Sequence, residues 1–218
     1  AAKAMPGIVD VVTFENSVAV VGKSTWQCKK AREVLKIEYE KAADLESSED
    51  HNRIFSNLMN NGEATVRRKN GDVDTAFKGA AKIIKAEYQC PFLPHSPLEP
   101  MNFFAHVRED GVELVGPTQT PDRAREAAAK ITGFPTEKIT VEITRQGGGF
   151  GRRLSADFAI EAVHVPTPLK VPAKVIWTRA DDMTGGTYRR AVRYRFEAAL
   201  DKNGEMIGYK LRGVGINS

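Results

Sequence analysis

The sequence predicts an α+β protein, in which helices and strands follow one another without a regular strand–helix–strand rhythm. Several short segments alternate apolar and polar residues with the two-residue period of a strand, and others begin with a helix cap. The mixed order of these segments favours α+β over a doubly wound sheet. At 218 residues, with 41% hydrophobic and 28% charged residues, the chain has the composition of a folded protein with a core.

The first third of the chain predicts two strands and two helices. In order, they are an apolar strand at residues 18–22, a helix from Ser24 or Thr25 to Glu33, a strand at 34–39, and a helix at 49–60 capped by Ser48 and ended by Asn61-Gly62. The polar, acidic residues 41–51 read as a loop with the start of the second helix, and we place a domain boundary between residues 41 and 72.

The middle of the chain contains an expected strand at residues 82–89 and then four prolines in residues 91–100, which require an extended connection. Strands are expected at residues 102–107 and 111–115. Thr120, Pro121 and Asp122 have the chemistry of a helix start, and Gly133 can end that helix.

The last third begins with an alternating strand at residues 139–145, which leads into a glycine-rich segment. Further expected elements are a helix from Ser155 or Asp157 to His164, and strands at 173–177, 193–200 and 206–213, the last two joined by a turn at 201–204.

Charge and cysteine usage exclude several classes of function. The net charge of +4 comes from interleaved acids and bases, which argues against nucleic acid as the main partner. Cys28 and Cys90 lie far apart with no CxxC pair, so this chain alone predicts no iron–sulfur or structural zinc site. No apolar run is long enough for a transmembrane helix.

The glycine-rich segment is the main candidate site. Residues 147–153 read Gly-Gly-Gly-Phe-Gly-Arg-Arg, and they match neither the dinucleotide fingerprint nor the Walker pattern. Backbone amides of such a loop can form a nest for oxygen atoms, with Arg152 and Arg153 beside it for anionic groups. A glycine-rich turn without a ligand fits the same residues equally well.

Three further features are weaker evidence for a functional site than the glycine-rich segment. Gln119 stands between a strand and a helix cap, where its amide can donate and accept hydrogen bonds. His95 and Glu99 have a helical metal-ligand spacing, but Pro97 between them breaks a helix. The arginines of residues 188–195 fit an anion site less well than they fit a solvated strand face.

Four motifs in order resemble the large, molybdenum-binding subunit of the xanthine dehydrogenase and aldehyde oxidase family, with the isoquinoline 1-oxidoreductase beta-subunit type as the most similar branch. They lie at residues 94–100, 116–121, 147–153 and 177–189. Gln119 precedes Phe150 at the distance that this family shows. Residues 5–7 and 18–26 also resemble the late part of the family's α/β-hammerhead domain.

The resemblance implies a partial α/β-hammerhead domain with its linker at residues 1–62, and the first portion of a molybdopterin-cofactor-binding domain at 63–218. The implied cofactor is molybdenum–molybdopterin in its cytosine dinucleotide form, which hydroxylates an N-heterocycle or an aldehyde with water. Gln119 would hydrogen-bond the apical oxo ligand, and Phe150 would shape the pocket. The implied cofactor-binding residues are Gln119, Gly148, Gly149, Phe150, Gly151 and Arg152, with no direct metal ligand.

Positions where this sequence differs from the family, and family features that it lacks, lead to further expectations. Leu154 stands where xanthine-type members have an acidic residue, which argues against a purine substrate. The family's general-base glutamate is expected beyond Ser218, so no catalytic residue is assigned and turnover by this polypeptide alone is not expected. An iron–sulfur subunit with 2Fe–2S clusters is the implied partner, and the branch is often exported to the periplasm.

Two functions that involve no molybdenum chemistry stay open as alternatives. One is a stand-alone module that binds an anion or phosphate without redox activity, and the other is an interaction domain that uses the proline-rich residues 91–100.

Overall fold

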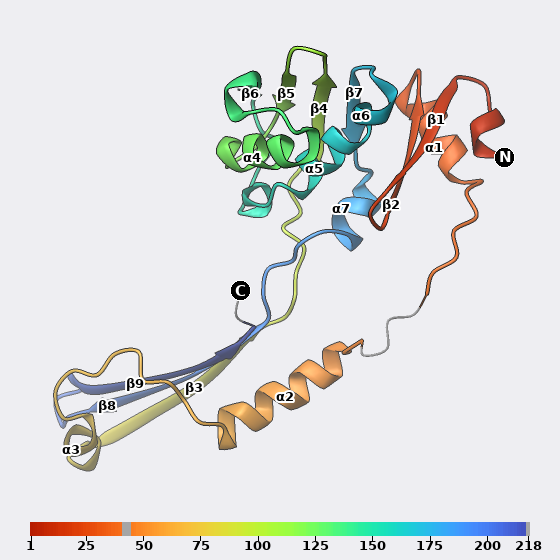
Figure 1. Cartoon of the computed structure of the whole chain (residues 1–218). Helices are drawn as coiled ribbons and strands as arrows, with labels where there is room; N and C mark the ends of the chain where they lie inside the picture. Colours follow the sequence, from red (N-terminus) through yellow and green to blue (C-terminus); the bar gives the residue numbers. More distant parts are fainter. Residues whose placement is uncertain (41–44, 217–218) are drawn as a thin grey trace. The chain divides into compact units, whose positions relative to one another are not determined.

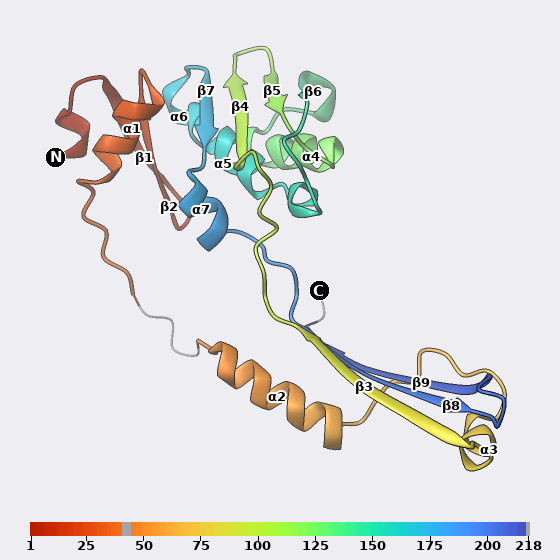
Figure 2. The same ribbon diagram turned by 180° about the vertical axis from the view of Figure 1, so that it is seen from behind.

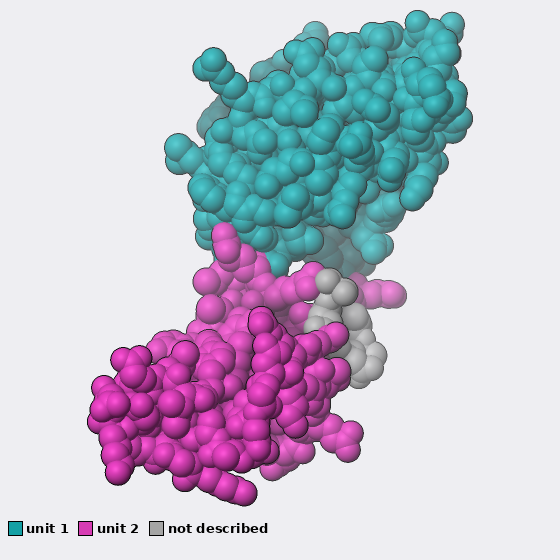
Figure 3. Space-filling model, turned by 90° about the vertical axis from the view of Figure 1, so that its left-hand side faces the viewer, with its two compact units in different colours: residues 1–39, 94–188 teal, residues 40–93, 189–218 magenta. Residues whose placement is uncertain are grey.

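Three β-sheets organise residues 1–40 and 45–216, which are the residues described by this computed structural model (Figures 1 and 2). These residues group into two compact units, Ala1–Tyr39 with Pro94–Tyr188 and Glu40–Leu93 with Arg189–Ser218, coloured separately in Figure 3. Helices and strands are mixed throughout. The predicted boundary between residues 62 and 63 separates two family domains. The compact units do not test that boundary, so it stays a prediction.

The first unit contains a four-stranded sheet in the order β6-β5-β4-β7. Its strands are β4 (Asn102–Val107), β5 (Val112–Gly116), β6 (Ile139–Ile143) and β7 (Ala173–Ile176). β4 is antiparallel to both β5 and β7, whereas β5 and β6 are parallel and joined through α4 (Pro121–Thr132). The four strands confirm the sequence prediction, although β6 ends two residues earlier than expected.

The core of this unit lies between the sheet and the helices α4 and α5 (Asp157–His164), which Figure 1 shows beside the strands. Phe103 of β4 and Phe158 of α5 are fully buried and meet edge to face, with ring centroids 5.7 Å apart. Both helices confirm their predicted starts and ends. Pro121 opens α4, and Gly133 closes it at φ +78°, in the left-handed region that glycine adopts without strain.

The same unit includes a hairpin of β1 (Ile8–Phe14) and β2 (Ser17–Gly22), followed by α1 (Thr25–Arg32) with Ser24 as its cap. β2 and α1 were predicted and β1 was not. The strand expected at residues 34–39 is wrong, because residues 35–40 form neither helix nor strand. Tyr39 is 86% exposed, and strand-like alternation does not form a strand unless a neighbour takes its backbone hydrogen bonds.

Short helical segments complete the first unit. They are η1 (Ala2–Ala4), η2 (Thr136–Lys138), η3 (Arg152–Leu154), α6 (Pro166–Leu169) and α7 (Arg179–Thr184). No helix was predicted where α7 lies. Thr178 and Asp181 form a capping box, in which each side chain accepts from the other's backbone amide.

The second unit contains an antiparallel sheet in the order β3-β8-β9, formed by β3 (Lys82–Cys90), β8 (Val192–Leu200) and β9 (Met206–Gly215). All three strands were predicted. The helix α2 (Ser48–Asn61) is capped by Ser47, one residue before the expected Ser48, and α3 (Val73–Lys78) was not predicted. Residues 41–44 of the expected acidic loop lie outside the described residues.

The arginines of β8 are used inside the second unit. Arg193 donates to Ser56 and Gln89, and Arg195 donates to Glu87 and Asn60. This favours the strand-face interpretation of the arginine cluster over an anion site. No helix in the described part of the chain is both long and apolar enough to cross a membrane.

Candidate cofactor site

Three segments meet near the carboxyl ends of β5 and β6: residues 94–100, residues 117–119 and residues 146–151, which we call the cradle. β5 and β6 are parallel, so the segments that follow them leave the same edge of the sheet. Gln146 joins two of the segments through a 3.1 Å bond from Nε2 to the carbonyl oxygen of Thr118. Motifs far apart in the sequence thus form one local structure.

The glycine-rich part of the cradle has an unusual backbone. The φ angle is +96° at Gly148, +52° at Phe150 and +93° at Gly151. Glycine adopts such angles readily, and a phenylalanine there is strained unless its surroundings hold it. Arg152 N donates to Gly149 O at 2.8 Å and closes this tight turn. The shape of the loop therefore requires glycine at positions 148 and 151.

Gly149 has a steric reason to be glycine. A Cβ atom at this position would lie 2.6 Å from Oε1 of Gln119, which is closer than a Cβ atom approaches an oxygen without one of them shifting. Gln119 is itself exposed, and its Oε1 accepts a 3.2 Å bond from Gly151 N. With Oε1 engaged by the loop, the Nε2 group of Gln119 remains to donate to a ligand.

The loop amides fit a ligand that carries oxygen acceptors. Among the residues that the structure describes, no acceptor is bonded to the N–H groups of Gly148 and Gly149. Their carbonyl oxygens, by contrast, accept from Arg153 Nε at 2.9 Å and from Arg152 N. Two amides without an acceptor in the described residues, the Nε2 donor of Gln119 and glycines that add no Cβ atoms fit the phosphate and pterin oxygens of a nucleotide-like cofactor.

Arg152 does not present its charge to this site. Its side chain is 1% exposed and forms a two-pronged ion pair with Asp157, at 2.8 and 2.7 Å. Its guanidinium carbon also lies 5.3 Å from the ring centre of Trp177. The expectation that both arginine side chains face an external anion is therefore wrong, and a contribution of Arg152 to cofactor binding stays a prediction that falls on its backbone.

Arg153 is fully buried and paired with Glu99, at 3.0 Å between Nη2 and Oε2. The sequence placed Arg153 beside the loop but predicted neither Glu99 as part of the site nor the pairing of the two, because nothing in a single sequence links positions in separate motifs. Burial acts to raise the pKa of Glu99. Hydrogen bonds from Gly147 N and Asn102 and the charge of Arg153 outweigh it, and together they hold that pKa below its usual value.

Two residues with predicted roles lie at the surface of the loop. Phe150 is 63% exposed and Leu154 is 46% exposed, so both side chains are accessible. His95 lies beside Gly151, since its Nε2 is 3.6 Å from where a Cβ of Gly151 would be. Within the described ranges, no group of three or more histidine, cysteine, aspartate or glutamate side chains is arranged to hold a metal ion.

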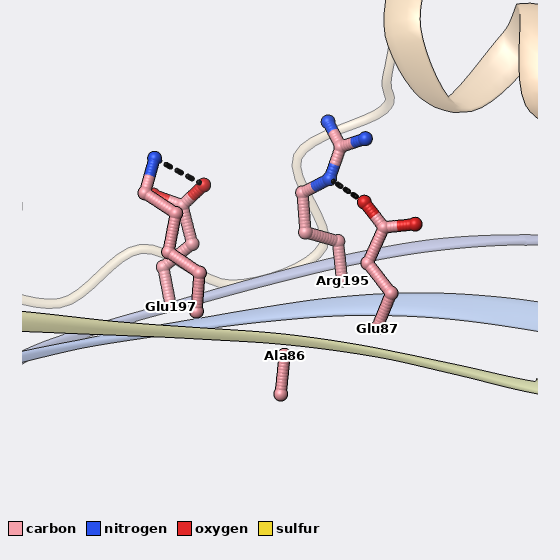
Figure 4. Close-up of a pocket in the computed structure, with 5 residues that line it drawn as sticks. Ala86, Glu87, Arg195 and Glu197 are labelled. Atoms are coloured by element: carbon pink, nitrogen blue, oxygen red, sulfur yellow. Dashed lines mark hydrogen bonds and ion pairs between the residues drawn. The ribbon is translucent and has the colours of Figure 1, made fainter.

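A shallow pocket on the sheet of the second unit does not compete with this site (Figure 4). Glu87 and Arg195 form an ion pair at 2.6 Å, and Lys85 and Glu197 form another at 3.3 Å. The charges of the pocket are thus matched within the chain.

Comparison with known proteins connects the cradle with one family. The family described as "Molybdopterin cofactor-binding domain" matches residues 54–215. Isoquinoline 1-oxidoreductase subunit beta of Brevundimonas diminuta is 32% identical over 210 residues, which are 92% of this chain and 27% of that protein. Membrane-bound aldehyde dehydrogenase (pyrroloquinoline-quinone) of Gluconacetobacter polyoxogenes is 32% identical over 187 residues, which are 84% of this chain and 24% of that protein.

A similar fold occurs in the crystal structure of quinoline 2-oxidoreductase from Pseudomonas putida 86. Its TM-score is 0.71 at 19% identity, and the match covers 97% of this chain and 32% of that chain. The chain thus spans about a quarter to a third of the length of these proteins. The stand-alone anion module has no support, since a known family is matched and the arginines that it requires are buried.

These matches confirm the resemblance to the large subunit of the xanthine dehydrogenase and aldehyde oxidase family, and the chain belongs to the family of molybdopterin cofactor-binding domains.

Proposed function

We propose that this chain forms one part of the molybdopterin site of an oxidoreductase that hydroxylates an N-heterocycle or an aldehyde with water. The observation that carries the proposal is the approach of Gln119 to the glycine loop, with Oε1 held by Gly151 N and Nε2 left to donate. When bound, the molybdenum cofactor supplies the oxidising centre, which takes two electrons from the substrate carbon.

The residues of the cradle would bind and orient that cofactor. The amides of Gly148 and Gly149 would donate to its oxygens, and the bare backbone of Gly149 and Gly151 would allow its close approach. Gln119 Nε2 would donate to an oxygen acceptor of the cofactor from a fixed direction, because the bond to Gly151 N sets the orientation of the amide. Phe150 would border the pocket, and Arg152 would act through the turn that its N–H closes.

Proton transfer needs a group outside the cradle. Glu99 is the carboxylate beside the loop, and it is committed to Arg153, Gly147 and Asn102. A carboxylate with a lowered pKa and three donors is a poor general base at neutral pH. We therefore propose that the base is a glutamate outside these 218 residues, and that this polypeptide alone has no turnover.

The substrate proposed first is an isoquinoline-like N-heterocycle. A relative at 32% identity is an isoquinoline 1-oxidoreductase subunit, and the exposed Leu154 offers an apolar side chain beside the loop. An aldehyde is the second candidate, because the other relative at 32% identity is an aldehyde dehydrogenase. We further propose the cytosine dinucleotide form of the cofactor, an iron–sulfur partner subunit with 2Fe–2S clusters, and a partial hammerhead domain at residues 1–62.

Gln119 provides the test. In the assembled, cofactor-loaded enzyme, Gln119→Glu keeps an oxygen to accept from Gly151 N but replaces the Nε2 donor by a second oxygen, whereas Gln119→Ala removes both. We expect both variants to lower kcat roughly 10- to 100-fold with isoquinoline, the size of effect seen when a hydrogen-bond partner of a metal site is lost. Benzaldehyde and hypoxanthine assayed in parallel separate the substrate classes.

An unchanged kcat in Gln119→Glu would contradict the role of Nε2. Faster turnover of hypoxanthine than of isoquinoline by the unsubstituted enzyme would contradict the substrate assignment.

A further inference from the structure

We propose that the buried Arg153 and its partner Glu99 form a clamp that positions the three segments of the cradle, so that Arg153 is a positioning residue for the cofactor. This inference rests on the proposed function. The Arg153 side chain is fully buried, whereas the Glu99 side chain that pairs with it is 35% exposed. Their effect on the cofactor would pass through the backbone groups that they hold.

The guanidinium of Arg153 reaches all three segments. Nε donates to Gly148 O at 2.9 Å, Nη1 to Pro117 O at 3.4 Å, and Nη2 to Glu99 O at 2.9 Å. The backbone of Arg153 adds a fourth connection, because its carbonyl oxygen accepts from Gln119 N at 3.1 Å. A single side chain therefore fixes the distance between the glycine loop and the segment that carries Gln119.

Glu99 completes the clamp from the proline-rich segment. Its Oε2 accepts from Gly147 N at 2.9 Å as well as from Arg153, and its Oε1 accepts from Asn102 Nδ2 at 2.9 Å. The backbone N–H of Glu99 in turn donates to the carbonyl oxygen of Gly147 at 3.1 Å. Gly147 is also so close to Glu99 that a Cβ atom there would overlap the Glu99 side chain.

Lysine cannot replace arginine in this clamp. The planar guanidinium offers donors in several fixed directions, whereas an ammonium group is a compact charge on a flexible stem. Arg153→Lys would keep the buried positive charge opposite Glu99 and lose the simultaneous bonds to Gly148 and Pro117. The variant therefore separates geometry from charge.

The neighbouring pair of Arg152 and Asp157 is a matched control. It is likewise a buried arginine with a carboxylate partner, at 2.7 Å, but no bond of its guanidinium to a cradle carbonyl is seen in the described residues. Asp157→Asn should therefore lower stability, as loss of a buried ion-pair partner does. It should leave the distances between the cradle segments unchanged.

The clamp should weaken in acid. The charged groups that face Glu99 are Arg153 and Lys174, and a surface pocket is lined by Glu99, Lys174 and Arg145 together. Arg153 also faces Asp182 and Arg152. Because the pKa of Glu99 is lowered in the folded chain, its contribution is complete above the ordinary glutamate pKa of about 4.3 and is lost as the pH falls through the lowered value.

The experiment measures cofactor retention in the loaded enzyme. Wild type, Arg153→Lys, Glu99→Gln and Asp157→Asn are desalted, and the molybdenum and pterin that remain are followed with time from pH 7 to pH 3, beside Tm. We expect Arg153→Lys and Glu99→Gln to lose cofactor roughly tenfold faster or more at pH 7. Glu99→Gln should also lose the acceleration that wild type shows below about pH 4.3, and Asp157→Asn should release cofactor at the wild-type rate at pH 7 despite a lower Tm.

Two results would overturn the clamp: wild-type retention in Arg153→Lys and Glu99→Gln, or release from Asp157→Asn as fast as from Arg153→Lys. If Arg153→Lys fails to fold, Glu99→Gln decides by the same comparison. Wild-type enzyme that never contains molybdopterin would instead overturn the proposed function, and the inference with it.

Discussion

Gly149 shows how one missing side chain shapes the cradle. The atom that a Cβ at this position would strike is Oε1 of Gln119, the end of a flexible side chain. Gln119 can swing away at little cost in stability, but its Nε2 would then leave the direction set by Gly151 N. Glycine at position 149 therefore matters more for the position of the Gln119 amide than for the stability of the fold.

We expect Gly149→Ala to separate stability from function. Its free energy of unfolding should stay within about 1 kcal/mol of wild type, since no backbone atom is among the nearest contacts of the added methyl group. Turnover of the loaded enzyme should fall at least about tenfold, as for loss of a partner of a metal site. Chemical denaturation and steady-state kinetics check the two halves. A variant with normal kcat would show that Gln119 need not hold its observed position.

The sequence predicts the parts of the site that lie within motifs, and only those. Gln119 and the glycine loop are found from their type and order. The pairing of Arg153 with Glu99, and the turn of Arg152 inward to Asp157, depend on which segments meet in three dimensions. One sequence without homologues contains no signal that joins such positions. The sequence could therefore place Arg152 and Arg153 beside the loop, but it could not predict which way their side chains point.

At the scale of elements, local chemistry predicted helices and strands wherever it was strong. The cap, the first-turn proline and the final glycine of α4 are all where the sequence places them. Segments with weaker signals were missed: β1 was not recognised, and the alternation of residues 34–39 formed no strand. Short helices such as α7 depend on a single capping box. Their stability comes from tertiary packing more than from propensity.

Two helix-ending glycines give a matched prediction at this scale. Gly133 ends α4 at φ +78° with open space around it, whereas Gly79 ends α3 at φ −87° with only ordinary contacts near an added Cβ. Gly133→Ala should lower the free energy of unfolding by about 1 kcal/mol, because only the left-handed position is strained for alanine. Gly79→Ala should be neutral or stabilising by up to about 1 kcal/mol. Equal effects in denaturant titrations would contradict this account of the caps.

At the scale of the whole molecule, the cradle is built within a single compact unit. All three segments fall in residues 94–188, so the candidate site does not depend on how the two units are arranged. The family match at residues 54–215 nevertheless draws on both units. Fold class and family were both predictable from the sequence, because ordered motifs identify a family even where individual contacts cannot be foreseen.

The central claim is that the glycine loop and Gln119 hold molybdopterin, and cofactor content tests it most directly. The measurement is molybdenum by elemental analysis and pterin by fluorescence after oxidation, in the purified enzyme that contains this chain and in its Gly149→Val variant. We expect stoichiometric molybdenum and pterin in the unsubstituted enzyme and a large loss of both in Gly149→Val, where a branched side chain fills the approach to the loop. Unsubstituted enzyme free of molybdenum and pterin, or a Gly149→Val variant that holds them in full, would contradict it.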